Sequence, residues 1–572
     1  MTMQTFTRLT IFLIIFSFGF LTIAQGQNNL EARINALFQE FSSKTPGVMV
    51  SIVKKNRIIY SKGLGSAQLE YGIPINEKTV FHIASDSKRF TALAILLLEK
   101  RGLLKLSNDI RQYFPKLPNF GHTITIKNLL QHTSGLRDQW QLLGMAGMRM
   151  EDVITQEHIL SVLFKQRALN FKPGEEFTYC NTGYTLLAEI VAKVSGQSFE
   201  DFTQQHIFRP LGMRHTHFHS NHKQIIPNRA YSYNQISKGR FEKEILNFSN
   251  VGATSLFTTA EDLQKWLIDV MSDHPKVAHK QLLATMQTKA TLPGGDPLIY
   301  GMGEMTFRYK GLKLIGHGGN DAGFNSFVGY FPDQEIGVIA LSNSRKVSAG
   351  NLVLKAVDLL IKEQGIKPTT TPPNTSSTTA TQPASFITPS KGVLATQTGV
   401  YETVWGNVFV KEQAGQLYFK NVDKDAKFQL FKAVSKTQYF NEGEQLVMKF
   451  TRFKNKRYQR LKITGPNNTN FSAKRIFLVD YSIADLKEFV GTYASKELET
   501  QYKIVLKDSM LVARHTRFQD IPLSLKSRDR FTGKKWFFGI VAFIRNPNGQ
   551  IEGMLVSGRR ERAKNVRFDK VK

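Results

Sequence analysis

The chain has 572 residues, of which 41% are hydrophobic, and this size and composition predict several domains with ordinary apolar cores. Its mean hydropathy of -0.25 excludes a polytopic membrane protein. The formal net charge is +30, from 76 Lys and Arg against 46 Asp and Glu. Such a charge can indicate nucleic-acid binding, but no helix-turn-helix, zinc or RNA-binding motif occurs, so no nucleic-acid partner is expected.

Residues 1–26 have the pattern of a secretory signal peptide. Arg8 provides a basic start, residues 9–24 are apolar, and Ala24-Gln25-Gly26 resembles a cleavage site between small residues. The apolar run is shorter than the roughly 20 residues of a membrane-spanning helix, so an uncleaved anchor is the less favoured alternative. We therefore expect a mature bacterial protein that begins near Gln27 and is secreted or periplasmic.

Ser85 and Lys88 form a Ser-x-x-Lys motif where a strand-like run becomes an amphipathic helix, in residues 81–102. Three residues are about one helical turn, so the ammonium can approach the hydroxyl. A serine hydroxyl is a poor nucleophile at neutral pH and needs a nearby base or cation, and the positive end of a helix stabilises developing charge. Taken alone, the motif is also explained by a solvated helix start.

Tyr179 and Asn181 are two residues apart, so in extended backbone their side chains face the same way. A cation such as Lys88 favours the phenolate form of a tyrosine, which can then act as a base. Asn181 could hold Lys88 and donate to a substrate carbonyl. A second interpretation, compatible with the first, is that Asn181 or Thr182 caps the start of a helix.

Cys180 lies between these two residues and is the only cysteine, so no intrachain disulfide can form. It is either a reactive thiol beside the motif or a small neutral filler. We favour the filler, because nothing in the motif requires a thiol.

His317-Gly318-Gly319 lies in a segment, residues 311–344, whose apolar alternation predicts antiparallel strands. Glycines in a strand often mark a close backbone approach. The edge of such a strand can present a backbone N–H to an oxyanion. The alternative is a glycine-rich turn that carries a surface histidine.

Residues 365–390 are rich in Thr, Ser and Pro and predict a flexible linker. Two segments of short β-like runs follow, residues 391–480 and 481–572, and they form a weak repeat of about 92 residues. Both predict small antiparallel barrels or curled sheets. The repeat pairs Gly399-Val400-Tyr401 with Gly491-Thr492-Tyr493, Leu417 with Leu511, Phe440 with Phe531 and Leu461 with Met554.

This tail also carries most of the charge excess. Residues 391–572 contain 35 Lys and Arg and 17 Asp and Glu, a net of +18. Attraction to an anionic cell envelope, or solubility alone, explains this excess better than nucleic-acid binding.

The three motifs, in this order, resemble those of the serine β-lactamase and penicillin-binding protein superfamily. The nearest branch is the class C β-lactamases with their D-aminopeptidase and esterase relatives. Further similar segments are LLQHTSGL (129–136), PGEEF (173–177), PLGM (210–213), LFTTAEDLQKW (256–266) and residues 326–343. The resemblance implies an α+β fold for residues 27–364, with an antiparallel sheet flanked by helices and a helical subdomain. The tail resembles the lipocalin-like domains attached to many such hydrolases.

The resemblance also implies roles for individual residues. Ser85 would be the acylated nucleophile, Lys88 its proton-transfer partner and Tyr179 the general base. Asn181, His317 and Gly319 would contact substrate, and the N–H groups of Ser85 and Asn320 would form the oxyanion hole. No metal or organic cofactor is implied.

Two residues depart from the family pattern. Ala84 stands where a glycine is frequent, and His317 stands where β-lactamases usually have a carboxylate-binding lysine. A neutral histidine is a poorer carboxylate anchor at pH 7. We therefore expect a secreted serine hydrolase that cleaves a small ester or a D-amino-acid-containing amide or peptide. The alternatives are a β-lactamase or DD-carboxypeptidase, and a catalytically silent envelope binding protein.

Overall fold

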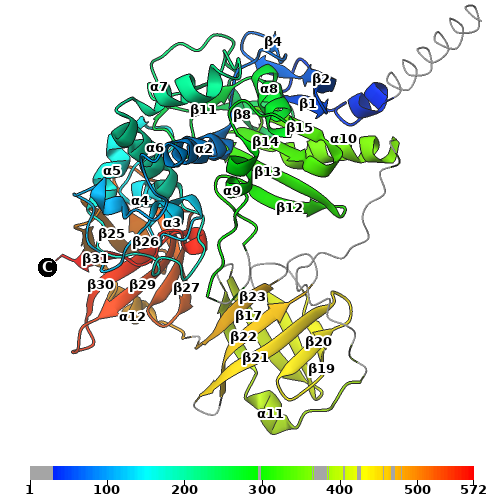
Figure 1. Ribbon diagram of the computed structural model, residues 1–572. Helices are drawn as coiled ribbons and strands as arrows, with labels where there is room; N and C mark the ends of the chain where they lie inside the picture. The colour runs from blue at the N-terminus through cyan, green and yellow to red at the C-terminus, as the bar shows by residue number, and fades with distance from the viewer. Residues whose placement is uncertain are drawn as a thin grey trace, which may run out of the picture. The chain divides into compact units, whose positions relative to one another are not determined.

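The computed structural model (Figure 1) describes residues 30–571, apart from 294, 296–297, 364, 366–382, 384, 404–405, 422–426, 455–456, 466–469 and 478. The predicted signal peptide and most of the predicted linker lie outside the described residues. The described residues form two units. One contains those within Met1–Gly135, Met150–Phe164 and Phe171–Thr370, and the other contains those within Leu136–Arg149, Lys165–Asn170 and Thr371–Lys572.

A six-stranded antiparallel sheet forms the centre of the first unit. Its strands, in spatial order, are β12 (Met305–Tyr309), β13 (Leu312–Asp321), β14 (Phe324–Phe331), β15 (Ile336–Ser342), β1 (Val48–Lys54) and β2 (Arg57–Leu64). The strands expected around the third motif are therefore confirmed. The N-terminal strand β1 completes the sheet by pairing with β15, from Val48 opposite Ser342 to Lys54 opposite Ile336.

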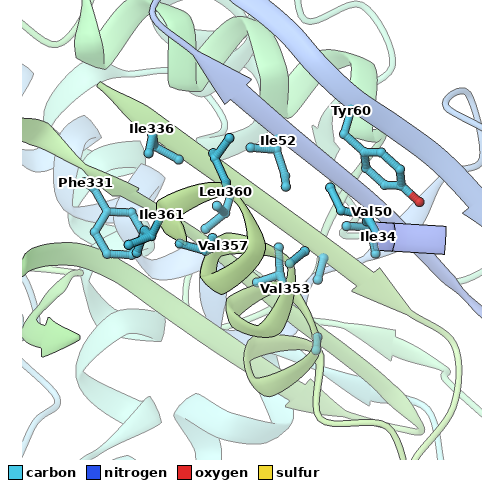
Figure 2. Close-up of a cluster of buried hydrophobic side chains, with 14 of the residues drawn as sticks. Ile34, Val50, Ile52, Tyr60, Phe331, Ile336, Val353, Val357, Leu360 and Ile361 are labelled. Carbon is cyan, nitrogen blue, oxygen red and sulfur yellow. The ribbon is translucent and has the colours of Figure 1, made fainter. Parts of the chain in front are cut away.

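One face of this sheet packs on α10 (Ala349–Glu363), as Figure 1 shows. Val50 and Ile52 point to this face because successive strand residues alternate sides. Figure 2 shows them in the same apolar layer as Val353 and Val357 of the helix. Each such side chain stabilises the fold by about 1.5–3 kcal/mol when buried.

Helix α8 (Ala260–Met271) packs on the opposite face. Gln264 Nε2 donates to the Ser51 hydroxyl at 3.0 Å, and the Trp266 ring lies 4.9 Å from the ring of Phe90 in α2 (Ser87–Lys100). Helix α2 in turn contacts α6 (Asn181–Ser195). Nearly every residue of α2 is buried, so the helix that follows the Ser-x-x-Lys motif runs through the interior of the unit.

The other elements of the first unit are short. The strands are β3 (Ser66–Gln68), β4 (Ile73–Pro74), β5 (Phe81–His82), β6 (Ile154–Thr155), β7 (His217–Phe218), β8 (Ser232–Ser237), β9 (Arg240–Glu244), β10 (Phe248–Ser249) and β11 (Leu256–Thr258). The helices are η1 (Ala84–Asp86), η2 (Ile110–Gln112), α3 (Ile126–Leu130), α5 (Gln156–Phe164), α7 (Phe199–Thr203), η3 (Gln204–Phe208), α9 (Lys280–Met286) and η4 (Pro332–Gln334). No helix in the described part of the chain is both long and apolar enough to cross a bilayer.

Two closed eight-stranded antiparallel barrels dominate the second unit. The first contains β16 (Gly399–Thr403), β17 (Gly406–Gln413), β18 (Gln416–Asn421), β19 (Gln429–Ala433), β20 (Gln438–Asn441), β21 (Leu446–Lys454), β22 (Arg457–Thr464) and β23 (Asn470–Ile476). The second contains β24 (Gly491–Ser495), β25 (Thr500–Lys507), β26 (Met510–Arg514), β27 (Ile521–Ser527), β28 (Arg530–Lys535), β29 (Phe538–Arg545), β30 (Ile551–Ser557) and β31 (Val566–Lys570). The expected α+β fold with two barrels is confirmed.

The sequence repeat has a structural counterpart. A short helix precedes the first strand of each barrel, α11 (Lys391–Ala395) in one and α12 (Ile483–Lys487) in the other. In each first strand a buried tyrosine hydroxyl donates to the carbonyl four residues earlier, from Tyr401 at 2.7 Å and from Tyr493 at 2.8 Å. The two barrels are therefore built on the same local plan.

The second barrel also packs on two segments from earlier in the chain, residues 136–149 and 165–170. The first of these contains α4 (Gln139–Met145). Gln141 Nε2 donates to the Arg559 carbonyl at 2.6 Å, and the Tyr502 hydroxyl donates to the Met145 carbonyl at 3.1 Å. In the chain these segments lie between the first and third sequence motifs, yet they belong to the second unit together with the barrels.

Candidate active site

Ser85 lies in η1, a single turn between β5 and α2. The Lys88 Nζ is 3.3 Å from the Ser85 Oγ. This places the two groups together as the motif spacing predicts. The turn is held by Ser87, whose hydroxyl donates to the Ala84 carbonyl at 2.5 Å and accepts from the Leu256 N–H at 3.1 Å.

Ala84, the residue before the candidate nucleophile, has a φ of 49°. This left-handed conformation costs a residue with a Cβ about 1–2 kcal/mol and is free of that cost for glycine. The turn thus explains physically why glycine is frequent at this position. Here the surrounding packing holds the strained conformation, since Ala84 is buried.

Lys88 is fully buried and also contacts two groups far away in the sequence. Its Nζ donates to Asn181 Oδ1 at 2.9 Å and to the Ala253 carbonyl at 2.6 Å. Helix α6 begins at Asn181 and its N-cap is Cys180, without a side-chain capping bond. The capping interpretation of Asn181 and Thr182 is therefore wrong, and Asn181 holds the lysine instead. The Ala253 contact was not predicted, because a backbone carbonyl has no sequence signature.

The Tyr179 ring lies beside this ammonium, with its centroid 4.9 Å from the Lys88 Nζ. Aromatic neighbours enclose it: ring centroids are 4.3 Å away in His132, 6.0 Å in Tyr300 and 6.2 Å in His317. Neither His132 nor Tyr300 belongs to the three motifs, although His132 lies in the LLQHTSGL segment. A cation against an aromatic face is attractive in such an enclosed site.

His317 is 2% exposed on β13, so the interpretation as a surface histidine is wrong. Its Nδ1 lies 2.7 Å from the Gly318 carbonyl and its Nε2 3.4 Å from the Tyr300 hydroxyl. Burial, aided by the nearby Lys88 cation, lowers the pKa of His317 to about 3. His317 is therefore neutral at pH 7 and supplies no fixed positive charge.

Gly319 brings the β13 edge against the nucleophile turn. A Cβ at this position would overlap the Ile83 carbonyl oxygen and the Ser326 hydroxyl, and would lie 3.0 Å from the Ala84 Cβ. Only glycine fits this approach. Asn320 follows directly and is exposed on the same strand. The role of its N–H in an oxyanion hole stays a prediction.

A buried ion group ties the first turn of α2 to β14. Asp86 accepts from the Ser326 hydroxyl at 2.6 Å and from Arg89 Nη2 at 3.2 Å, and Arg89 Nη2 also donates to the Val328 carbonyl at 2.7 Å. Arg89 Nη1 lies 3.8 Å from the buried Glu304. Burial raises the pKa of Asp86 to about 7, with partial compensation from Arg89, and it also raises the pKa of Glu304.

The raised pKa of Asp86 predicts a pH-dependent stability. The folded state binds a proton that the unfolded state releases above the ordinary value of 3.8, so stability should fall as pH rises from about 4 to 7. Asp86→Asn keeps the shape of the side chain and removes the titrating carboxyl group, so the variant should lack this pH-dependent contribution to stability. Relative to the native chain, the stability of this variant should therefore increase between about pH 4 and pH 7, by at most about 1.4 kcal/mol per pH unit, and its melting temperature should increase with it. Thermal scans across that range measure this, and a difference independent of pH would contradict it.

Cys180 is buried between Tyr179 and Asn181, and its N–H donates to His132 Nδ1 at 3.1 Å.

Within the part of the chain that the structure describes, no group of three or more His, Cys, Asp or Glu is arranged to hold a metal ion. The residues predicted for the site all belong to the first unit: Ser85, Lys88, Tyr179, Asn181, His317, Gly319 and Asn320.

Comparison with known proteins is consistent with this arrangement. The beta-lactamase family model matches residues 34–360, which contain all three motifs. "Protein flp" of Staphylococcus aureus (strain MW2) is 29% identical over 327 residues, which are 55% of this chain and 64% of that protein. The match thus spans less than two thirds of that relative. "Putative penicillin-binding protein PbpX" of Bacillus subtilis (strain 168) is 30% identical over 314 residues, 54% of this chain and 74% of that protein.

A solved structure extends the likeness beyond the matched range. The octameric penicillin-binding protein homologue from Pyrococcus abyssi is 26% identical, with a TM-score of 0.52 over 78% of this chain and 99% of that chain. More than half of the present chain matches the family model, and its first unit has the antiparallel sheet and helices that the resemblance implied. The chain belongs to the beta-lactamase family, a family of serine hydrolases that includes penicillin-binding proteins.

Proposed function

We propose that this protein is a serine hydrolase that forms an acyl-enzyme on Ser85 from an ester or a D-amino-acid-containing amide. The observation that carries the proposal is the position of Lys88. Its buried Nζ lies 3.3 Å from the Ser85 Oγ and 2.9 Å from Asn181 Oδ1, beside the Tyr179 ring. A binding protein has no need for this combination of groups.

The proposed reaction assigns a separate task to each of these groups. Tyr179 accepts the Ser85 hydroxyl proton while Lys88 stabilises the phenolate, and the Ser85 Oγ attacks the substrate carbonyl carbon. The N–H groups of Ser85 and Asn320 would stabilise the oxyanion. The intermediate then expels the alcohol or amine, which takes the proton from Tyr179. A water molecule, deprotonated by Tyr179, finally hydrolyses the seryl ester and regenerates Ser85.

A neutral His317 argues against β-lactams and free D-carboxylates as preferred substrates. A fixed cation would bind their carboxylate by a charge-assisted hydrogen bond, which is the stronger kind. His317 instead has its Nδ1 near its neighbour's carbonyl and its Nε2 near Tyr300. An ester, or an amide without a carboxylate on the leaving group, needs no such anchor.

A substrate panel with a covalent probe tests the proposal. A fluorophosphonate should add once, on the peptide that contains Ser85, and Ser85→Ala should abolish labelling together with turnover of nitrophenyl esters and D-aminoacyl nitroanilides. Labelling that survives in Ser85→Ala would refute the nucleophile assignment. A protein that binds these substrates but never turns them over would favour the binding-protein alternative.

The β-lactamase alternative is tested by His317→Lys. The new cation should raise turnover of a chromogenic cephalosporin relative to a neutral ester by about ten- to a hundredfold, the value of a hydrogen bond to a charged group. His317→Gln is the matched control, since it keeps a polar group and adds no charge. Native turnover of the cephalosporin that exceeds turnover of every ester and D-aminoacyl amide would instead identify a β-lactamase.

A further inference from the structure

We propose that Asp321 binds the α-ammonium group of the substrate, so that aminoacyl esters or amides with a free amino group are preferred. This inference rests on the proposed function and narrows its substrate class. Asp321 is the last residue of β13, four residues after His317, and its side chain is 24% exposed. It is a residue that no sequence motif singled out.

The direction of β13 places Asp321 and His317 on opposite sides of the nucleophile turn. Gly319 lies against Ile83 and Ala84, directly before Ser85. Asp321 lies beside His82, the residue that precedes Ile83, and its Oδ2 is 3.5 Å from His82 Nε2. His317 lies at the other end, 6.2 Å between ring centroids from Tyr179. The strand edge thus has a neutral end and an acidic end.

A short chain of contacts joins Asp321 to the catalytic groups. The Thr254 hydroxyl donates to Asp321 Oδ2 at 3.0 Å. The preceding residue, Ala253, accepts from the Lys88 Nζ at 2.6 Å. Consecutive Cα atoms are about 3.8 Å apart, so the residues that hold the Asp321 carboxylate and the Lys88 ammonium are direct neighbours.

One oxygen of the Asp321 carboxylate is able to accept another hydrogen bond. Among the described residues, Oδ1 has no hydrogen-bond partner, whereas Oδ2 has Thr254. The nearby Arg345 interacts electrostatically with Asp321 but donates its hydrogen bonds to Glu244, at 2.6 Å and 2.8 Å. An ammonium group is the complementary partner for this second oxygen.

The direction of the reaction selects which part of the substrate meets Asp321. The leaving group must receive a proton from Tyr179, so it lies toward the His317 end. The acyl part therefore extends toward Asp321. In an aminoacyl substrate the ammonium is bonded to the carbon next to the reacting carbonyl, so it lies on this acyl side. A cation on the acyl side of the substrate matches the acidic Asp321 end of the strand edge. A leaving group without a carboxylate matches the neutral His317 end.

Asp321→Asn tests the inference with two substrates that differ only in the amino group, D-alanyl p-nitroanilide and its N-acetyl derivative. We expect kcat/KM for the free amine to fall about ten- to a hundredfold, as for loss of a hydrogen bond to a charged group. The acetylated substrate and p-nitrophenyl acetate should change by less than about twofold. Glu244→Gln, which alters a nearby carboxylate paired with Arg345, is the control and should show no such selectivity.

A second readout does not depend on turnover of the anilides. D-Alaninamide should inhibit p-nitrophenyl acetate hydrolysis competitively, and its inhibition constant should rise by the same factor in Asp321→Asn. Equal losses on both anilides, or an unchanged inhibition constant, would overturn the inference. If ester hydrolysis depends on Ser85 while no free amine is bound or cleaved, the amine preference fails and the proposed function stands. If no activity depends on Ser85, the proposed function itself fails.

Discussion

Replacing Lys88 by methionine should lower turnover of every Ser85-dependent substrate by about 10²–10⁴-fold, the usual value of a positioned proton-transfer group. Methionine keeps the length of the side chain and removes its charge. The change would leave the Ser85 hydroxyl, the Asn181 carbonyl oxygen and the Tyr179 ring without the cation they share. KM should change much less than kcat, because the cation acts on the reacting proton.

The matched control for this variant is Lys265→Met. Lys265 also makes several polar contacts, to the Gly212 carbonyl at 2.9 Å and to Asp262 at 2.9 Å, but it lies on α8 away from the motifs. The Lys265→Met variant should lose some stability and keep the native kcat. Steady-state kinetics on a nitrophenyl ester, together with melting curves, separate the two effects. Retention of more than about a tenth of the native kcat in Lys88→Met would contradict the role of the lysine.

Arg137→Met should destabilise the second barrel by about 3–5 kcal/mol, the cost of leaving one partner of a buried ion pair. Arg137 Nη1 lies 2.8 Å from Glu497 Oε2, and both side chains are 3% exposed. Arg137 also donates to Gln166 at 2.9 Å and to the Asn565 carbonyl at 3.1 Å. The variant would leave the Glu497 carboxylate buried without its cation.

Lys165→Met provides the matched control, because Lys165 forms an ion pair with Glu499 at 2.6 Å while the two side chains are 39% and 66% exposed. An exposed pair contributes only about 0–1 kcal/mol. Calorimetry, with hydrogen exchange of peptides from residues 491–570 to identify the barrel's transition, measures both variants. The Arg137→Met/Glu497→Met double variant should recover part of the loss, since no charge then stays buried. Equal melting of the two single variants would refute the buried pair as a main source of stability.

Local patterns predicted much of the candidate site. The Ser-x-x-Lys spacing corresponds to one helical turn, and Lys88 does reach Ser85 at the start of α2. The alternation of residues 311–344 specified the antiparallel strands, because side chains in a strand alternate between its two faces. The 92-residue repeat likewise indicated two similar barrels, since each copy carries its own strand and turn signals.

Contacts between distant residues were decided only by the tertiary structure. The Ala253 carbonyl reaches Lys88, and Tyr300 reaches His317, through packing that no local period encodes. Asn181 illustrates the limit, because its side chain suited a helix cap by local preference, yet the buried lysine is the stronger partner.

The sequence by itself thus determined the three candidate motifs, the strand pattern and the number of barrels, because each depends on residues close together in the chain. Tertiary structure alone decided that Asp86, Arg89 and Glu304 meet in the interior and that Arg137 is buried against Glu497. The physical reason is that an unpaired charge is costly to bury, whereas a charge that is paired and hydrogen-bonded is tolerated in the interior. Local sequence does not show which charges will be enclosed together.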